Sequence, residues 1–226
     1  MNILQGRIVA ITGAGGHLGR VLVRRFVEAG ATVVAIVGSE ASAFDLPFDE
    51  SREAWAYVAD VTDEAAVCET FDAMAREVGP LDLLVHAVGA WEASPLSDTS
   101  LRAWQNQLDV NLTSTFLCFR EASKHMVGHG GRLVAFASRQ GADRGAMEQA
   151  AYSAAKAGVV RLVEAAAQEF QGHITAHAIA PSHLVDEAGE AGGVLCDDVA
   201  KMCVALATPL GDAFNGQVLR LYGLDG

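Results

Sequence analysis

Seven short apolar stretches recur along the chain, each rich in Val, Ile, Leu and Ala. They do not alternate between apolar and polar residues, as a strand with one solvent-facing side would. Apolar side chains on both faces are typical of parallel strands covered by helices on either side. The stretches that we predict as strands are Arg7–Thr12, Thr32–Val37, Ala54–Ala59, Leu81–Ala87, Gly131–Ala137, Ile174–Ala180 and Gln217–Leu221.

Stretches with helical patterns lie between these strands. The regular strand–helix alternation predicts an α/β protein with a doubly wound parallel sheet of about seven strands and right-handed crossovers. No repeat or linker divides residues 1–226, so we expect a single domain, and the polar segment Ser39–Glu53 is expected to form a loop. The predicted helices are Gly16–Ala29, Glu64–Glu77, Leu101–Val127, Gln149–Gln171 and Asp197–Ala207.

Composition limits the binding partners and the cellular compartment that can be expected for this domain. The chain has 226 residues, of which 51% are hydrophobic, enough to bury one large core. A net charge of -12 argues against a general nucleic-acid or anionic-membrane binder, which needs a basic surface. The apolar stretches are too short to span a bilayer, and the N-terminus does not resemble a signal peptide. The four cysteines form no C-x-x-C pair or zinc spacing, so we expect a cytoplasmic protein with free thiols and no metal.

A glycine-rich turn, Thr12–Gly19, joins the first predicted strand to the first predicted helix. Glycines at such a turn let backbone N–H groups approach a pyrophosphate at the helix N-terminus, where the helix dipole favours anions. Leu18 breaks the G-x-G-x-x-G pattern, and no G-K-[ST] follows as in a P-loop. An ordinary strand-to-helix turn is the alternative, and the position after the first strand favours dinucleotide binding.

Tyr152 and Lys156 are four residues apart and therefore share one face of a predicted helix. An ammonium beside a phenol favours the phenolate and lowers the tyrosine pKa from about 10 toward working pH. Such a tyrosine can exchange a proton with a carbonyl or alcohol oxygen. A Y-x-x-x-K pair alone is common on ordinary helices, but Ser138 and Asn111 precede it in the chain.

Together these motifs resemble the short-chain dehydrogenase/reductase family, of the classical type in a short variant. The family turn reads T-G-x-x-x-G-x-G, which Thr12, Gly13 and Gly19 match, while His17 replaces the central glycine. The similarity continues to Asn215–Leu219 and covers nearly the whole chain. The resemblance implies a single Rossmann-like dinucleotide-binding oxidoreductase domain over residues 1–226.

The resemblance implies a role for each of four residues. Tyr152 would be the general acid/base, and Lys156 would lower its pKa and bind the nicotinamide ribose. Ser138 would hold the substrate oxygen, and Asn111 would hold a water-bridged proton relay. The alternatives are a strand-end hydroxyl bonded to backbone for Ser138 and a buried helix amide for Asn111.

The resemblance also identifies positions that would bind the cofactor. Asp60 would bond the adenine edge, although an aspartate there could equally serve a turn or an N-cap. Ser39 could bond a 2′-phosphate, Glu40 could instead bond ribose hydroxyls, or both could simply start a solvated loop. The strand before them carries no acidic residue at its end, so NADP is slightly preferred over NAD. The positions expected to bind the cofactor are Gly13, Gly15, Gly16, His17, Leu18, Gly19, Ser39, Asp60, Val61, Ala87, Gly89, Tyr152, Lys156 and Pro181.

Two further positions depart from the family pattern. His86 replaces an asparagine near the end of the fourth strand, where a satisfied structural histidine is expected. Asp186 falls where the family often has a threonine that touches the nicotinamide carboxamide. Residues expected to line the substrate pocket are Trp91, Arg139, Gln140, Met147 and His183.

The sequence thus predicts an enzyme that transfers a hydride between NADP or NAD and a small carbonyl or alcohol substrate. Two alternatives remain: a dinucleotide-binding regulatory protein with little turnover, and an enzyme like dihydropteridine reductase. The resemblance also implies a homotetramer or homodimer that pairs through Leu101–Val127 and Gln149–Gln171.

Overall fold

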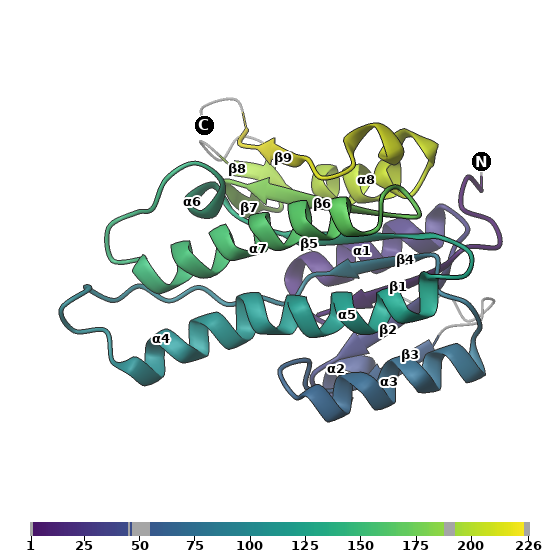
Figure 1. Ribbon diagram of the computed structural model, residues 1–226, viewed down its shortest axis with the longest axis horizontal. Coiled ribbons are helices and arrows are strands. Elements are labelled where there is room, and N and C mark those ends of the chain that lie inside the picture. Colours follow the sequence, from purple (N-terminus) through teal and green to yellow (C-terminus); the bar gives the residue numbers. More distant parts are fainter. Residues whose placement is uncertain (1, 45, 47–54, 188–192, 224–226) are drawn as a thin grey trace.

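The computed structural model describes residues 2–44, 46, 55–187 and 193–223. Its centre is a seven-stranded sheet in the order β3-β2-β1-β4-β5-β6-β9, and every neighbouring pair is parallel (Figure 1). The strands are β1 (Ile8–Thr12), β2 (Thr32–Val37), β3 (Trp55–Val58), β4 (Leu83–His86), β5 (Gly131–Phe136), β6 (Ile174–Pro181) and β9 (Val218–Leu221). The predicted doubly wound parallel sheet is therefore confirmed, and Ala54 of the third predicted strand lies outside the described residues.

Helices cover both faces of this sheet, as Figure 1 shows. One face packs against α3, α5 and α7, and the other packs against α1 and α8. Successive strand residues point to opposite faces, which is why the strands are apolar throughout. The helices are α1 (His17–Glu28), α3 (Glu64–Glu77), α4 (Leu101–Leu108), α5 (Ser114–Met126), α7 (Ala150–Glu169) and α8 (Cys196–Leu206).

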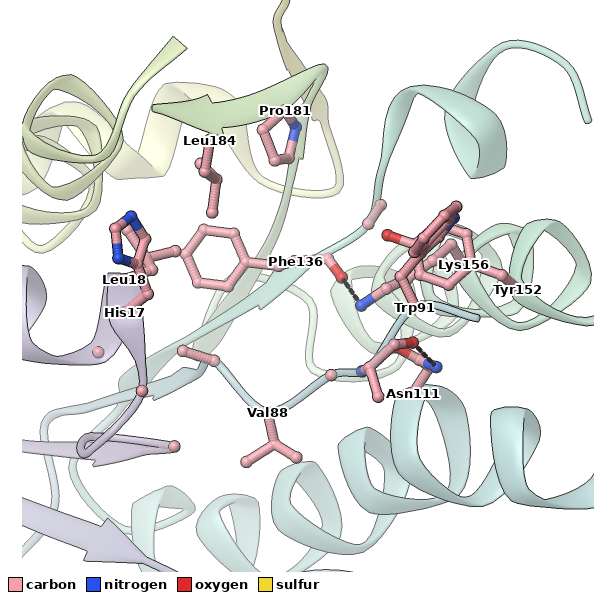
Figure 2. Close-up of a pocket in the computed structure, with 17 residues that line it drawn as sticks. His17, Leu18, Val88, Trp91, Asn111, Phe136, Tyr152, Lys156, Pro181 and Leu184 are labelled. Atoms are coloured by element: carbon pink, nitrogen blue, oxygen red, sulfur yellow. Dashed lines mark hydrogen bonds between the residues drawn. The ribbon is translucent and has the colours of Figure 1, made fainter. Parts of the chain in front are cut away.

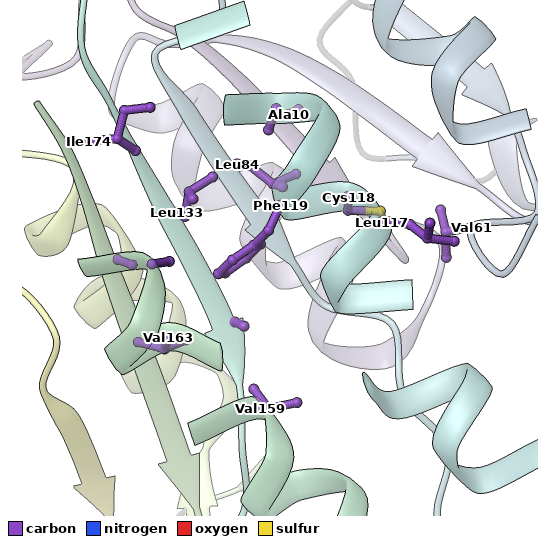
Figure 3. Packing of buried hydrophobic residues seen from close by; sticks show 14 of the residues in the cluster. Ala10, Val61, Leu84, Leu117, Cys118, Phe119, Leu133, Val159, Val163 and Ile174 are labelled. Atoms are coloured by element: carbon purple, nitrogen blue, oxygen red, sulfur yellow. The ribbon is translucent and has the colours of Figure 1, made fainter. Parts of the chain in front are cut away.

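The two faces form two hydrophobic cores from alternate residues of the same strands. Ala10 of β1 and Leu84 of β4 point into the core under α3, α5 and α7, part of which is drawn in Figure 3. Their neighbours Ile11 and Val85 point into the core under α1 and α8. The sheet is thus packed on both faces, and this packing fixes the positions of side chains at the carboxyl ends of its strands.

The predicted helix Leu101–Val127 is interrupted where Asn111 lies. Residues Asp109–Thr113 form a π-helical turn between α4 and α5. Directly after this turn, the hydroxyls of Ser114 and Thr115 donate to carbonyls four residues earlier, at 2.7 and 2.9 Å. Hydroxyls that bond the preceding turn bend helices, and single π turns are frequent at functional sites.

Several short elements were not predicted. Part of the expected loop Ser39–Glu53 forms the helix α2 (Glu40–Phe44), and residues 45 and 47–53 of that loop lie outside the described part. After β5 the chain forms α6 (Arg139–Ala142), and after β6 it forms the parallel pair β7 (His183–Val185) and β8 (Gly193–Leu195). A 3-10 helix, Pro209–Phe214, precedes β9. Among the described residues, no helix is long and apolar enough to cross a membrane.

Candidate active site

A cavity of about 300 Å³ opens at the carboxyl ends of the central strands. The chain reverses its winding direction between β1 and β4, and ligands of open α/β sheets bind in the crevice at such a point. Figure 2 shows the side chains that surround it. The lining residues are Gly13, Gly16, His17, Leu18, Gly19, Ala87, Val88, Gly89, Ala90, Trp91, Asn111, Phe136, Ala137, Tyr152, Lys156, Pro181 and Leu184.

The glycine turn forms one end of this cavity. Its first glycine, Gly13, cannot be replaced by a larger residue without strain. Gly13 has φ +68°, and a Cβ there would lie 2.9 Å from the carbonyl oxygen of Ala87. The Gly16 N–H donates to the Gly13 carbonyl at 2.9 Å, and α1 begins at His17 with no acidic residue in its first turn. The positive end of this helix therefore faces the cavity without a competing carboxylate of its own, as an anion site requires.

Two side chains, Asn111 and Lys156, converge around Gly89 at the other end of the cavity. A Cβ on Gly89 would lie 2.9 Å from Oδ1 of Asn111 and 3.1 Å from Nζ of Lys156. Asn111 is fully buried, donates through Nδ2 to the Ala90 carbonyl at 2.8 Å and accepts from the Ala90 N–H at 3.2 Å. The structure therefore brings the predicted asparagine and lysine together, and glycine provides the space between them.

Lys156 is buried, and its Nζ donates to the Phe136 carbonyl at 2.8 Å (Figure 2). Burial lowers the pKa of this lysine to about 8. Burial also raises the pKa of Tyr152, with a hydrogen bond from Ser138 acting in the opposite direction. The expected lowering of the tyrosine pKa is therefore wrong, because the loss of hydration outweighs the hydrogen bond from Ser138. A tyrosine with a raised pKa stays protonated and can act as an acid.

Tyr152 also lines a second cavity, of about 390 Å³, so it stands between the two spaces. Ser138 lines only the second cavity, whereas Lys156 and Asn111 line only the first. Ser138 is also the N-cap of α6, where its Oγ accepts from the Gly141 N–H at 3.2 Å. The second cavity is lined by Trp91, Ser138, Gln140, Gln149, Tyr152, Pro181, Ser182, His183 and Leu184.

Two residues expected in the substrate pocket lie elsewhere. The Arg139 guanidinium stacks on the Tyr222 ring, 5.1 Å from its centroid. Met147 is 87% exposed and lines neither cavity. Trp91, Gln140 and His183 do line the second cavity, as expected.

Four of the expected cofactor positions lie outside the first cavity. Ser39 follows β2 and bonds the Ser42 hydroxyl at 3.0 Å, and a Cβ on Gly15 would also meet Ser42. Asp60 is a turn aspartate: its Oδ1 accepts from both the backbone N–H and the hydroxyl of Thr62, and these bonds lower its pKa.

Val61, the fourth of these positions, is buried in the core beneath α3 and α5. The N-cap of α3 is Asp63, not Asp60. Ser39, Asp60 and Val61 follow the outer strands β2 and β3, so they extend the carboxyl-terminal edge beyond the cavity.

The structure accounts for the two histidines that depart from the family pattern. His86 is buried and bonds Thr12 Oγ1 through Nδ1 at 2.8 Å and Ser114 Oγ through Nε2 at 3.1 Å. Burial, and then Lys156, lower its pKa to about 3, so it is a neutral structural group, as expected. His17 pairs through Nε2 with Oδ1 of Asp186 at 3.1 Å. Two residues that depart from the family pattern therefore contact each other.

Several residues that line the two cavities were not predicted from the sequence. Phe136 and Leu184 line the first cavity, and Gln149 and Ser182 line the second. Apolar residues at the end of a buried strand are indistinguishable from core residues in a sequence. Ser182, directly after Pro181, could have been found from its place at the end of a predicted central strand.

The residues at the first cavity fit a nicotinamide dinucleotide. The glycine turn offers a helix N-terminus and close backbone approach for a pyrophosphate. The opposite end offers the lysine, the asparagine and the space kept by Gly89. A Cβ at Gly13 or Gly89 would meet neighbouring atoms at 2.9 Å, so each end of the cavity requires a residue without a side chain.

Comparison with known proteins identifies the same family. The family model described as short chain dehydrogenase matches residues 7–188. A D-threitol dehydrogenase from Mycolicibacterium smegmatis is 31% identical over 191 residues, 82% of this chain and 73% of the relative. A cis-4-hydroxycyclohexanecarboxylate dehydrogenase from Sinomonas cyclohexanicum is 36% identical over 185 residues, 78% of this chain and 73% of the relative.

Solved structures resemble the fold closely. The crystal structure of a gluconate 5-dehydrogenase from Burkholderia cenocepacia J2315, in complex with NADP and tartrate, superposes with a TM-score of 0.90. It is 28% identical, and the match covers 98% of this chain and 96% of that one. The chain therefore belongs to the short-chain dehydrogenase/reductase family and is an NAD(P)-dependent oxidoreductase.

Proposed function

We propose that Tyr152 is the general acid/base of this enzyme and that it works between a cofactor cavity and a substrate cavity. The observation that carries the proposal is that Tyr152 lines both cavities, with Lys156 and Asn111 on one side and Ser138 on the other. A proton donor at the boundary of the two spaces can reach the oxygen of a substrate whose carbon faces the cofactor.

In this mechanism NADPH, when bound, supplies a hydride to the carbonyl carbon of the substrate. The Ser138 hydroxyl orients the carbonyl oxygen, and the Tyr152 hydroxyl gives its proton to that oxygen. Lys156 holds the nicotinamide ribose through its ammonium, and Asn111 keeps the adjoining backbone of Ala90 in place. The Tyr152 hydroxyl is protonated at neutral pH, so it can supply the proton in the reduction direction.

The turn residues Gly13, Gly15, Gly16, His17, Leu18 and Gly19 would hold the pyrophosphate, with the adenosine extending toward Ser39, Asp60 and Val61. NADP is proposed over NAD because Ser39, which follows β2, and Ser42 of α2 offer hydroxyls, and the strand itself carries no carboxylate. The NADP in the similar Burkholderia enzyme supports this preference.

For the substrate we propose a small uncharged polyol or the corresponding hydroxyketone. Serine, glutamine and histidine side chains line the second cavity, and no Lys, Arg, Asp or Glu is among its described lining residues. Arg139, which could have bound an acid, stacks on Tyr222 instead. D-threitol, named for one relative, is a polyol of this kind.

The proposal is tested by following nicotinamide absorbance with the purified protein and a panel of tetritols, pentitols, hydroxyketones and hydroxy acids. We expect turnover with NADP(H) and uncharged polyhydroxylated substrates. Faster turnover of the hydroxy acids would contradict the substrate class. Saturable cofactor binding without turnover of any panel member would favour the regulatory protein instead.

We also propose a cytoplasmic homotetramer. The described cysteines are all free, and Leu101 and Phe116 leave apolar surface exposed along α4 and α5. Covering this surface with a second copy would bury it. A monomeric mass in light scattering would contradict the assembly.

A further inference from the structure

Three side chains from distant parts of the sequence meet beside the glycine turn. They are His17, Asp186 and Cys196, and one potential ligand atom from each lies within 4.8 Å of the other two. Nitrogen, carboxylate oxygen and sulfur form a donor set typical of zinc. No spacing motif could reveal this cluster, because its members belong to three different elements.

The fold positions the cluster through regular structure. The strands β7 and β8 are parallel, and Val185 pairs with Leu195, so the next residues, Asp186 and Cys196, leave the two strands side by side. Cys196 is the first residue of α8, and His17 is the first residue of α1. Backbone register and two helix starts thus hold all three residues in place.

A partly buried ion pair joins the helices that carry His17 and Cys196. Arg25 of α1 donates from Nε and from Nη2 to the two carboxylate oxygens of Asp197 on α8, each at 2.6 Å. Lys201 also contacts this carboxylate, at 3.0 Å. The Asp197 carboxylate is therefore already paired with Arg25 and Lys201. The carboxylate that contacts His17 is that of Asp186.

The separation of two of these atoms already suits a tetrahedral ion. Zinc bonds of about 2.0–2.1 Å to nitrogen and oxygen at a tetrahedral angle place those ligand atoms about 3.3 Å apart. The distance from His17 Nε2 to Asp186 Oδ1 is 3.1 Å. The third ligand, Cys196, is buried, whereas the His17 and Asp186 side chains are more than half exposed, so an ion can enter from solvent.

We propose that His17, Asp186 and Cys196 form a zinc site with a fourth position open to water. On binding, the Cys196 thiol releases its proton to solvent and its sulfur bonds the ion. His17 contributes neutral Nε2, and the carboxylate of Asp186 contributes one oxygen. The ion replaces the His17–Asp186 hydrogen bond and joins α1 to the segment after β7.

The chain contains a matched control cluster. Asp72 contacts His125 Nε2 at 3.3 Å and Cys68 Sγ at 3.9 Å, so the same three residue types lie together on α3 and α5. The three ligand atoms there do not all fall within the separation found at His17, Asp186 and Cys196. Its variants should therefore leave zinc binding unchanged.

The test is a titration of the chelator-treated, cofactor-free full chain with Co²⁺, followed by absorbance, and then displacement of Co²⁺ by Zn²⁺. We expect saturation at one equivalent with thiolate-to-cobalt charge transfer and intense tetrahedral d–d bands. Cys196→Ser should remove the charge-transfer band, and His17→Gly or Asp186→Asn should weaken binding about 10- to 100-fold. His17 and Asp186 are exposed, so their variants test the site even if Cys196→Ser fails to fold.

Cys68→Ser and His125→Gln should bind Co²⁺ like the unchanged protein. The proposal is overturned by the absence of saturable binding, by a spectrum without thiolate charge transfer, or by unchanged binding in His17→Gly. Loss of binding in the two control variants would overturn it as well, because the ion would then belong to the cluster on α3 and α5.

Discussion

The ammonium nitrogen of Lys156 lies over the Tyr152 ring, 5.9 Å from its centre, and donates to the Phe136 carbonyl. The two side chains share a helix face, yet no hydrogen bond joins them. Lys156 instead borders the space that Gly89 keeps open beside Asn111. The tyrosine stays protonated, ready to act as an acid.

Replacing Tyr152 by phenylalanine removes the proton donor and leaves the ring that separates the two cavities. We expect kcat to fall by about 100-fold or more, the lower range for losing a general acid. Cofactor affinity should stay within about twofold, measured by fluorescence titration. Tyr57→Phe is the matched control, because Tyr57 bonds Glu77 at 2.7 Å on the far strand β3 and should keep full turnover. A Tyr152→Phe enzyme with normal kcat would refute the mechanism.

The charge on Lys156 should make cofactor binding depend on pH. Its pKa is about 8, so the ammonium is present below that pH and is lost as pH rises through it. A lost charge-assisted hydrogen bond weakens binding by about tenfold or more. The dissociation constant of NADPH should therefore rise between about pH 7 and pH 9.5.

In Lys156→Met, NADPH should bind weakly at every pH, while the exposed Lys201→Met variant should keep the dependence of the unchanged protein. A dissociation constant that stays flat with pH in the unchanged protein would show that Lys156 does not hold the cofactor through its charge.

Gly89→Ala tests the convergence of Asn111 and Lys156. The new Cβ would lie 2.9 Å from Asn111 Oδ1 and 3.1 Å from Lys156 Nζ, so both groups must move by tenths of an ångström or more. Small displacements of positioned groups can cost up to about 100-fold in rate, so we expect kcat/KM to fall at least tenfold. Gly128→Ala places its Cβ in open space and should change nothing. Equal activity of the two variants would mean that the geometry at Gly89 is unimportant.

Ser39→Asp should reverse the proposed cofactor preference. A carboxylate at this position repels a 2′-phosphate and can accept hydrogen bonds from ribose hydroxyls. We expect NADPH to bind about tenfold or more weakly and NADH to bind no worse, as measured by calorimetry. The exposed Ser97→Asp variant adds the same charge elsewhere and controls for net charge. If NADPH binding survives in Ser39→Asp, the phosphate does not sit near this residue.

Local patterns explain what the sequence could predict. The strand Thr32–Val37 and the helix Glu64–Glu77 were predicted with their observed bounds, because apolar continuity and helical periodicity are properties of neighbouring residues. The i,i+4 spacing likewise placed Tyr152 and Lys156 on one helix face. The order and spacing of the glycine turn, Asn111, Ser138 and the tyrosine carried the resemblance to the family.

Non-local contacts explain what could not be predicted. The π-helical turn at Asn111 depends on how the helix packs and on hydroxyls that bond the turn before them. The direction of Arg139 depends on Tyr222, and the pKa of Tyr152 depends on burial by segments far along the chain. The proximity of Asp186 and Cys196 depends on the register of β7 and β8, which carries no local signal.

The hydrogen bonds of His86 should make the fold acid-sensitive. The Ser114 hydroxyl donates to the Val110 carbonyl, so it must accept from His86 Nε2–H, and Thr12 then donates to the unprotonated Nδ1. Only the neutral imidazole fits this pattern. Its pKa is about 3 when folded and about 6.5 in an unfolded chain, so the unfolded state binds more protons between these values.

Stability contributed by neutral His86 is therefore complete above about pH 6.5 and is lost as pH falls toward 3, with about 2 kcal/mol lost by pH 5. His86→Asn cannot take up a proton. At pH 7.5 it should be less stable by about 1–3 kcal/mol, for the buried hydrogen bonds it loses. The difference between the two proteins should shrink at pH 5, as measured by urea unfolding.

His177, also buried and with its pKa lowered to about 4, is present in both proteins and cancels from the difference. A difference that stays constant with pH in His86→Asn would mean that His86 accepts a proton in the folded protein.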